Sequence, residues 1–213
     1  MKILKIDPET CRETELLPAV SLLQKEKVII HPTETVYGIA AVYSSQPAIS
    51  KINRLKQRAQ SQPLSIMVNS IGKILEISGV QNEWVQNFLG KILPGAVTVL
   101  LPRRRISEHA YWNRFPLLGF RYPNHRLSIL LVSLVEQPLI TTSANLSGEP
   151  PVQSVAQLPA KLVDNCSLVV DGGETRGNIA STIIQIDIEQ RTISLVRPGA
   201  TPWEFIENCF VHI

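Results

Sequence analysis

Short apolar runs that fit β-strands alternate along this chain with segments of helical periodicity. Residues 28–30 and 36–43 fit two strands, and residues 46–56 fit a helix because Ile49, Ile52 and Leu55 recur on one face. Further strands are expected at residues 63–68, 96–101, 117–121, 139–142, 168–171, 181–187 and 192–196, and further helices at 70–76, 84–93, 124–135 and from about 202. This alternation predicts an α/β fold, and the absence of a repeat or a long linker predicts one domain over residues 1–213.

Three polar motifs stand where the predicted elements end. They are residues 32–38 (Pro-Thr-Glu-Thr-Val-Tyr-Gly), residues 56–58 (Lys-Gln-Arg) and residues 143–148 (Ser-Ala-Asn-Leu-Ser-Gly). Ligands of α/β proteins bind where the strands end, so we expect these segments to meet at one site. The third motif can form a nest of N–H donors for a phosphate or a carboxylate, although the same residue types also make ordinary polar turns.

Four cationic residues are candidate ligand contacts. Lys56 and Arg58 end the predicted helix, where both can turn toward one pocket and bind phosphate. The alternative is that they only favour the helix C-terminus through its dipole. Arg121 lies near the end of a predicted strand and suits a substrate carboxylate, and Arg197 ends the last predicted strand.

The first polar motif has an unusual composition for a hairpin. In an extended segment Thr33 and Thr35 should project to one side, and Glu34, which lies between them, to the other. The phenol of Tyr37 is a candidate to pack on a base or a substrate while its hydroxyl bonds elsewhere.

Composition and missing motifs exclude several classes of protein. The chain is 44% hydrophobic and 18% charged, as expected for a globular protein, and has no 20-residue apolar run. Residues 1–7 contain no long apolar stretch, so we expect no secretory leader. We therefore expect a soluble, cytoplasmic protein that does not enter a membrane. The three cysteines are widely separated and form no zinc motif. P-loop, Gly-x-Ser-x-Gly and His-Glu-x-x-His motifs are absent too, and no histidine has the pattern of a metal ligand or a catalytic base.

Positive charge is concentrated in residues 103–126, although the formal net charge is only +3. This region has one acid, Glu108, and six arginines: Arg103, Arg104, Arg105, Arg114, Arg121 and Arg126. Such a region suggests an anionic partner, namely a nucleotide, a phosphate or an RNA. A solvated loop is the alternative for the first three arginines.

Taken together, the motifs resemble the YrdC family, whose best-known members are threonylcarbamoyl-adenylate synthases. Eight family elements occur in the family's order between about residues 16 and 200. They are Pro-Thr-Glu-Thr-Val-Tyr-Gly (32–38), Lys-x-Arg (56–58), Pro-Leu (63–64), Pro-Gly (94–95), Arg-x-Pro (121–123), Ser-Ala-Asn-x-Ser-Gly (143–148), Ser-Thr (181–182) and Arg-Pro-Gly (197–199).

The resemblance implies a fold and a reaction. The expected fold is a twisted, open mixed sheet flanked by helices, with a concave basic ligand-binding face. The expected reaction joins L-threonine, bicarbonate and ATP into threonylcarbamoyl-AMP and pyrophosphate, for the threonylcarbamoyladenosine modification of tRNA. Mg²⁺ would enter with the ATP phosphates rather than at a protein metal site, and downstream threonylcarbamoyl-transferase proteins would be partners.

The resemblance also assigns roles to residues. Lys56 and Arg58 would be catalytic, holding the ATP phosphates and the carboxylate. The expected contacts of L-threonine are Thr35, Arg121, Thr141 and Ser181. The expected contacts of ATP are Arg58, Gln62, Ser143, Asn145, Pro151 and Arg197. Possible binding of tRNA or double-stranded RNA would use the Arg103–Arg126 region.

Three residues depart from the family pattern. Ala59 stands in place of a proline, Gln62 in place of an asparagine, and Gln185 in place of an aspartate. If that aspartate orders Mg²⁺ or a loop, its loss would impair catalysis. The arginine-rich Arg103–Arg126 region makes an RNA-binding member without catalysis one alternative, and a carbamoyl-transfer module like that of hydrogenase-maturation proteins is another. We expect the short form of the family, without the extra C-terminal domain of longer members.

Overall fold

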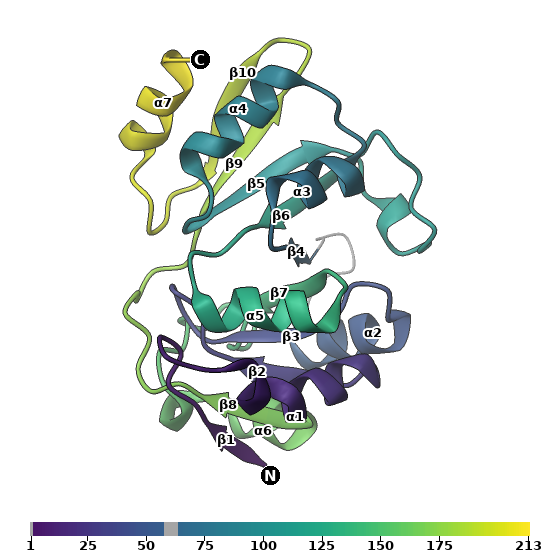
Figure 1. The fold of residues 1–213 in the computed structure, drawn as a ribbon, viewed down its shortest axis with the longest axis vertical. Helices are drawn as coiled ribbons and strands as arrows, with labels where there is room; N and C mark the ends of the chain where they lie inside the picture. The colour runs from purple at the N-terminus through teal and green to yellow at the C-terminus, as the bar shows by residue number, and fades with distance from the viewer. Residues whose placement is uncertain (1, 58–63) are drawn as a thin grey trace.

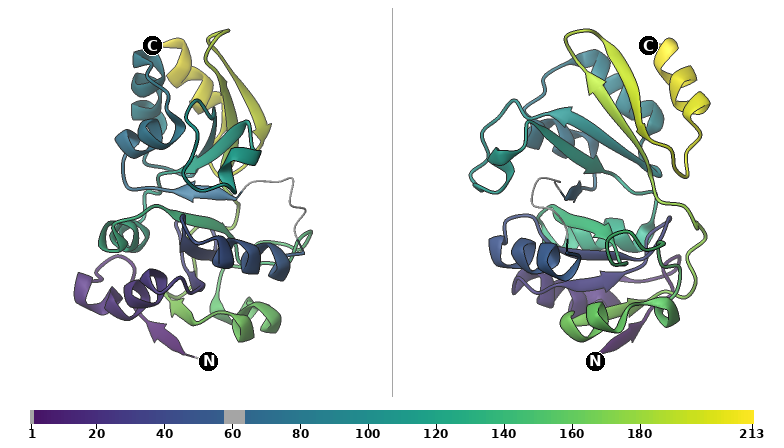
Figure 2. Two further views of the ribbon diagram at one scale, coloured as in Figure 1. Left: turned by 90° about the vertical axis from the view of Figure 1, so that its right-hand side faces the viewer. Right: turned by 180° about the vertical axis from the view of Figure 1, so that it is seen from behind.

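A computed structural model of the chain describes residues 2–57 and 64–213, which form a ten-stranded mixed sheet. The strands are β1 (Ile3–Lys5), β2 (Ile29–His31), β3 (Gly38–Val42), β4 (Ser65–Met67), β5 (Val97–Pro102), β6 (Leu117–Arg121), β7 (Leu139–Ser143), β8 (Leu168–Asp171), β9 (Thr182–Asp187) and β10 (Thr192–Arg197). Their order across the sheet is β1-β8-β2-β3-β7-β4-β6-β5-β9-β10. The sheet is open and twisted, with the chain termini at opposite ends of the long axis (Figures 1 and 2).

Helices flank this sheet, as an α/β fold requires. They are α1 (Glu13–Gln24), α2 (Gln46–Leu55), α3 (Ile71–Ser78), α4 (Glu83–Ile92), α5 (Arg126–Val135), α6 (Ala160–Asn165) and α7 (Trp203–Val211), with short 3-10 helices η1 (Trp112–Arg114) and η2 (Val155–Gln157). The predicted α/β class and open mixed sheet are confirmed. No helix within residues 2–57 and 64–213 has the length and apolar character that a membrane crossing requires.

Every strand and helix expected from the sequence is present in the structure. β6 and β8 even have the predicted bounds. The sequence reading missed β1, α1 and α6. β1 and α6 are only three and six residues long, and α1 contains Pro18, which normally interrupts a helical pattern.

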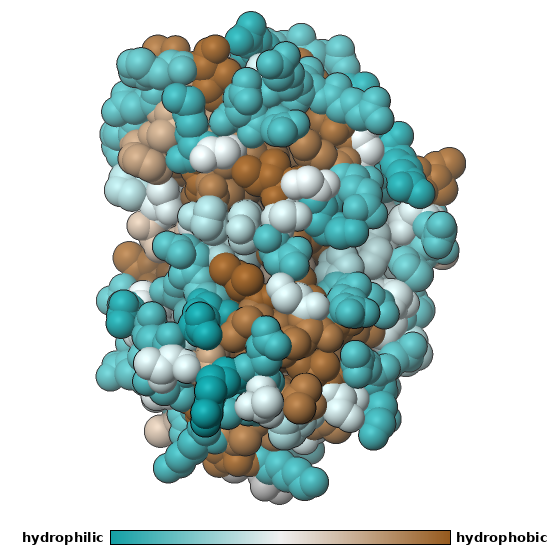
Figure 3. Space-filling view, viewed as in Figure 1, coloured by the Kyte–Doolittle hydropathy of each residue, from teal (hydrophilic) through white to brown (hydrophobic). Residues whose placement is uncertain are grey.

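The two faces of the sheet carry separate apolar clusters. Ile29 and Ala40 belong to the cluster that α1 and α5 cover, whereas their neighbours Ile30 and Ile39 belong to the cluster covered by α2, α3, α4, α6 and α7. This is the alternation that a strand buried on both faces produces. The surface over α1 and α5 keeps some hydrophobic character, with the exposed Leu17 among its residues (Figure 3).

Two features of the fold bring distant segments together. Helix α2 starts with the hydroxyl of Ser45 accepting from the Ala48 N–H, and ends at Leu55; the chain then turns at Gln57, whose φ is 51°. Residues 172–181, between β8 and β9, run along one side of the molecule from one half to the other (Figures 1 and 2).

Candidate functional site

A small polar hollow of about 160 Å³ lies over the middle of the sheet. Its lining is rich in hydroxyl groups and comprises Thr33, Thr35, Val36, Tyr37, Gly38, Ser65, Met67, Thr98, Arg121, Thr141, Thr142, Ser143, Ala180, Ser181, Ile183 and Arg197. All four residues expected to contact threonine are in this lining, as are Ser143 and Arg197 from the expected ATP contacts. The structure therefore brings together residues that are up to 162 positions apart in the sequence.

The register of the sheet creates much of this lining. Met67 of β4 stands opposite Arg121 of β6, Arg121 stands opposite Thr98 of β5, and Thr98 stands opposite Ile183 of β9. Side chains that are opposite one another in paired strands share a face of the sheet. This row of side chains across four strands therefore places the Arg121 guanidinium and the Thr98 hydroxyl between the apolar side chains of Met67 and Ile183.

The loop between β2 and β3 presents Thr35 to the hollow. The hydroxyl of Thr33 donates to the Val36 carbonyl at 2.7 Å and accepts from the N–H groups of Thr35 and Val36. Since its one proton is used, the 2.9 Å contact between the two threonine hydroxyls has Thr35 as the donor. The Thr35 oxygen keeps its acceptor capacity for a ligand. The two threonine hydroxyls lie together as predicted, but the segment bends at residues 34–36 instead of running extended, and Glu34 pairs with Arg121 of the same hollow.

Arg121 is held by an ion pair that the sequence reading did not anticipate. Its guanidinium donates to Glu34, and the two side chains are only 11% and 15% exposed. Each other ion pair of the described residues has side chains at least 39% exposed. Within the described part of the chain, Arg121 Nε and Glu34 Oε2 are buried and make no hydrogen bond, so the pair retains unused donor and acceptor positions.

Lys56 connects helix α2 to the loop after β7. Its ammonium donates to the Ser143 carbonyl at 2.5 Å, to the Ser143 hydroxyl at 3.3 Å and to Asn145 Oδ1 at 3.1 Å. The Ser147 hydroxyl donates back to the Lys56 carbonyl at 2.6 Å. The second and third polar motifs therefore meet, as predicted, and the buried Lys56 places a positive charge against the 143–147 loop next to the hollow.

Two glycines let the 172–181 segment and the end of β10 approach the site. A Cβ on Gly177 would lie 2.8 Å from the Glu34 carbonyl oxygen and 2.9 Å from Thr35 Cα. A Cβ on Gly199 would lie 2.4 Å from the backbone of Ala180, Ser181 and Thr182. Both distances are shorter than any carbon contact tolerates, so only glycine permits this approach.

Three titratable groups near the hollow are kept neutral by burial. Burial is the main cause that lowers the pKa of His31 to about 3; the nearby His125 and Arg121 contribute in the same direction, and a backbone contact with Pro32 opposes them. Burial also lowers the pKa of His125 and raises the pKa of Tyr37 to about 12. The Tyr37 hydroxyl donates to the Gly173 carbonyl at 2.6 Å, so this phenol anchors the 172–181 segment.

Comparison with known proteins places the chain in a family. The family model labelled Sua5/YciO/YrdC, described as "Telomere recombination", matches residues 21–199. The chain belongs to this family. The threonylcarbamoyl-AMP synthase of Pyrococcus abyssi is 29% identical over 205 residues, which cover 96% of this chain and 60% of that protein. The putative threonylcarbamoyl-AMP synthase of Methanocaldococcus jannaschii is 31% identical over 212 residues, which cover 98% of each chain.

A solved structure of the same family agrees with the fold. The crystal structure of Pyrococcus abyssi Sua5 complexed with L-threonine matches with a TM-score of 0.86 and 27% identity, over 98% of this chain and 61% of that one. The present Sua5/YciO/YrdC chain spans about 60% of the length of the Pyrococcus abyssi relative.

Some predicted site residues of this Sua5/YciO/YrdC chain lie elsewhere. Asn145 is not in the lining and contacts the site through the Ser143 hydroxyl and the Lys56 ammonium, and Pro151 is not in the lining. Arg58 and Gln62 lie outside the described residues, so their roles stay predictions.

The sequence reading also missed hydroxyl groups of the site. Thr98 and Ser65 line the hollow, and the Thr98 hydroxyl lies 2.7 Å from that of Ser181. Each is a lone polar residue inside an apolar strand, at Val97-Thr98-Val99 and Leu64-Ser65-Ile66. A polar residue in such a run must find a polar partner or a cavity, and this signal could have identified both residues.

The six arginines of the predicted basic region have different surroundings. Arg103 donates to the carbonyls of Asn113 and Phe115, Arg104 pairs with Glu189, and Arg126 donates to the Cys11 carbonyl. With Arg121 paired to Glu34, four of the six make an internal side-chain hydrogen bond or ion pair. Binding of RNA through this region stays a prediction.

Among residues 2–57 and 64–213 no group of three or more His, Cys, Asp or Glu side chains could hold a metal ion.

Proposed function

We propose that this chain is a threonylcarbamoyl-AMP synthase, a nucleotidyltransferase that uses L-threonine, bicarbonate and ATP. The observation that carries the proposal is the position of the Lys56–Ser143–Asn145 cluster beside a hollow that contains Arg121 and several hydroxyl groups. The hollow has the polarity of a site for a small amino acid, and the cluster supplies a cation for phosphate. Family membership and the L-threonine complex of Pyrococcus abyssi Sua5 support the same function.

The hollow provides a complementary group for each part of L-threonine. The Arg121 guanidinium would bind the carboxylate, as a planar fork of donors does in other proteins. The Thr35 oxygen would accept from the amino group, and the hydroxyls of Thr141 and Ser181 would bond the side-chain hydroxyl. Met67 and Ile183, at the two ends of the cross-strand row, supply apolar contacts for the methyl group.

The reaction then requires alignment and charge neutralisation rather than a protein nucleophile. The threonine amine attacks bicarbonate and gives the N-carboxylate with loss of water. One oxygen of this carboxylate attacks the α-phosphorus of ATP, the bond to the β-phosphate oxygen breaks, and pyrophosphate leaves. Lys56 and Arg197 would neutralise the oxygens of the nucleotide and the N-carboxylate, with Arg58, Gln62, Ser143, Asn145 and Pro151 as further predicted contacts. Mg²⁺ bound to the phosphates would supply additional neutralisation.

The remaining elements of the proposal concern the cell. The mixed anhydride would pass to a threonylcarbamoyl-transferase that modifies tRNA in the cytoplasm.

Gln185, where the family pattern has an aspartate, lies two residues after Ile183 on β9 and is not in the lining. We therefore expect it to be compatible with catalysis.

Pyrophosphate release by the purified protein tests the proposal. Release should require ATP, Mg²⁺, L-threonine and bicarbonate together, and serine should be used about 10- to 200-fold less efficiently because it lacks the methyl group. The Arg121→Ala variant should raise the KM for threonine more than the KM for ATP. Release without threonine, or equal effects of this variant on both KM values, would contradict the assigned site.

A further inference from the structure

A second polar hollow, of about 290 Å³, lies between helix α2 and the 3-10 helix η1. Its lining consists of Gln46, Ser50, Asn53, Arg54, Gln57, Tyr111 and Arg114. None of these residues is acidic, and two of them carry guanidinium groups. We call these seven residues the α2–η1 hollow.

Two buried polar residues in the lining have unused hydrogen-bonding capacity. Asn53 is 9% exposed and Tyr111 is 2% exposed. Among the described residues, neither Asn53 Oδ1 nor the Tyr111 hydroxyl has a hydrogen-bond partner. Buried polar atoms without partners are rare in folded proteins, and an absent ligand or ion is one recognised reason for them. The tyrosine hydroxyl can donate a hydrogen bond, and a half-turn of the Asn53 amide would replace its oxygen with a donor.

The two arginines of the α2–η1 hollow are exposed and have no anionic partner in the described chain. Arg54 and Arg114 form no ion pair and no side-chain hydrogen bond with any described residue. The Arg114 guanidinium lies over the Tyr111 ring, 5.0 Å from its centroid, and 5.9 Å from the centroid of Phe115. A cation held against aromatic faces is positioned in advance for an anion.

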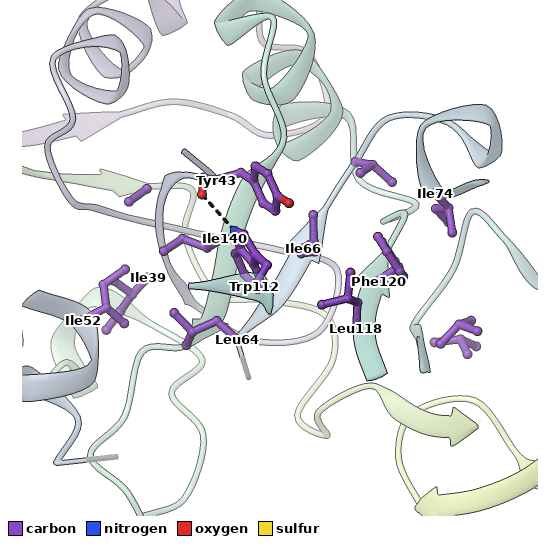
Figure 4. Close-up of a cluster of buried hydrophobic side chains, with 14 of the residues drawn as sticks. Ile39, Tyr43, Ile52, Leu64, Ile66, Ile74, Trp112, Leu118, Phe120 and Ile140 are labelled. Carbon is purple, nitrogen blue, oxygen red and sulfur yellow. Dashed lines mark hydrogen bonds between the residues drawn. The ribbon is translucent and has the colours of Figure 1, made fainter. Parts of the chain in front are cut away.

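The segment that carries Arg114 is fixed against the start of α2. The Trp112 ring stacks on Tyr43 with centroids 4.8 Å apart and an angle of 9° between the planes. The Trp112 indole N–H donates to the Tyr43 carbonyl at 3.2 Å (Figure 4). Since Tyr43 lies three residues before α2, the two arginines are supported by parts of the fold that are bonded together.

We propose that the α2–η1 hollow binds a phosphate group. Two guanidinium forks provide the charge, and the side chains of Gln46, Ser50 and Gln57 provide neutral donors around a buried floor. Tyr111 and Trp112 are buried and cannot stack on bases, so a nucleic acid would be recognised here through its backbone and without sequence preference. The phosphate belongs either to a free polyphosphate or to an RNA strand.

This site is separate from the candidate active site and independent of the proposed synthase activity. Lys56, at the end of α2, points to Ser143 and Asn145, whereas Arg54 and Gln57 line the α2–η1 hollow. No residue lines both hollows.

Backbone amide NMR of the full chain, titrated with sodium pyrophosphate or with a 12-base-pair RNA duplex, tests the proposal. Signals of Asn53, Gln57 and Tyr111 report on the α2–η1 hollow, and signals of Thr35 and Thr141 report on the other site. We expect the first group to shift with at least one of the two probes. Arg54→Gln and Arg114→Gln should each weaken that binding about tenfold. For the RNA, each of these two variants should also reduce the steepness of the plot of log binding constant against log salt concentration by about one.

Arg191→Gln is the matched control, because it removes the same charge from an exposed arginine that lies over an aromatic ring, outside both hollows and outside the Arg103–Arg126 region. It should leave the shifts and the affinity of this hollow unchanged. Shifts with pyrophosphate alone would identify a free polyphosphate as the ligand, and shifts with RNA alone would identify a nucleic acid backbone. No shift with either probe, or equal losses in the Arg191 and Arg114 variants, would overturn the proposal.

Discussion

The Glu34–Arg121 ion pair gives a sharp prediction about stability. Glu34→Gln keeps the size of the side chain and removes its charge, while Arg121 stays charged at 11% exposure. The charge-assisted hydrogen bond becomes a neutral acceptor contact, a loss of about 1–2 kcal/mol. The guanidinium then loses its counter-charge in a largely desolvated position, which raises the expected total to about 2–3 kcal/mol.

Thermal unfolding measures this loss directly. For a chain of this size, 1 kcal/mol corresponds to about 2–4 °C in Tm, so the Tm of Glu34→Gln should fall by about 4–12 °C. The difference should persist at high salt, because buried charges are screened little.

Glu189→Gln is the matched control for this prediction. It breaks an exposed ion pair between Glu189 and Arg104, in which the Arg104 side chain is 45% exposed and the Glu189 side chain is 78% exposed. Exposed pairs contribute about 0–1 kcal/mol, so its Tm should change by no more than about 4 °C. If the two variants lower the Tm equally, the buried pair does not stabilise the fold as argued.

Two further predictions concern pH and packing. Because the pKa of His31 in the folded chain is about 3, only the unfolded chain takes up its proton as pH falls below about 6.5, and stability is lost progressively down to pH 3. In urea unfolding, His31 should lower the free energy of unfolding by about 2 kcal/mol between pH 7 and pH 5. His31→Gln should abolish this contribution to the pH dependence. An unchanged pH dependence in the variant would refute the role of His31. Gly199→Ala should lower both the Tm and the affinity for threonine, because its Cβ would displace Ser181, whereas Gly90→Ala, in open space on α4, should raise the Tm slightly. A wild-type Tm for Gly199→Ala would mean that this close approach is not required.

Local patterns in the sequence were sufficient to predict most of the elements, although not β1, α1 and α6, and the meeting of the second and third polar motifs. The repeat of Ile49, Ile52 and Leu55 gave helix α2, and its C-terminal end placed Lys56 at the 143–148 loop. The order of strands could not be predicted in this way. β4 lies between β7 and β6, so the row of Met67, Arg121, Thr98 and Ile183 depends on pairings between strands that are not consecutive.

Charge was the least predictable property, because its effect depends on tertiary neighbours. Glu34 and Arg121 are 87 residues apart, and neither motif indicated that they would pair. The six arginines of residues 103–126 read as one basic patch in the sequence, yet Arg104 and Arg121 are paired with acids and Arg103 and Arg126 bind backbone carbonyls. Only the folded chain shows Arg114 beside Arg54.

The most direct test of the central claim is to identify the product with labelled bicarbonate. The purified protein would be incubated with ATP, Mg²⁺, L-threonine and ¹³C-bicarbonate, and the nucleotides analysed at once by mass spectrometry. The account predicts a threonylcarbamoyl-adenylate that is one mass unit heavier than with unlabelled bicarbonate and that disappears in the Arg121→Ala variant at low threonine. Conversion of ATP to AMP and pyrophosphate without a labelled adduct, or no conversion by the folded protein, would contradict the account.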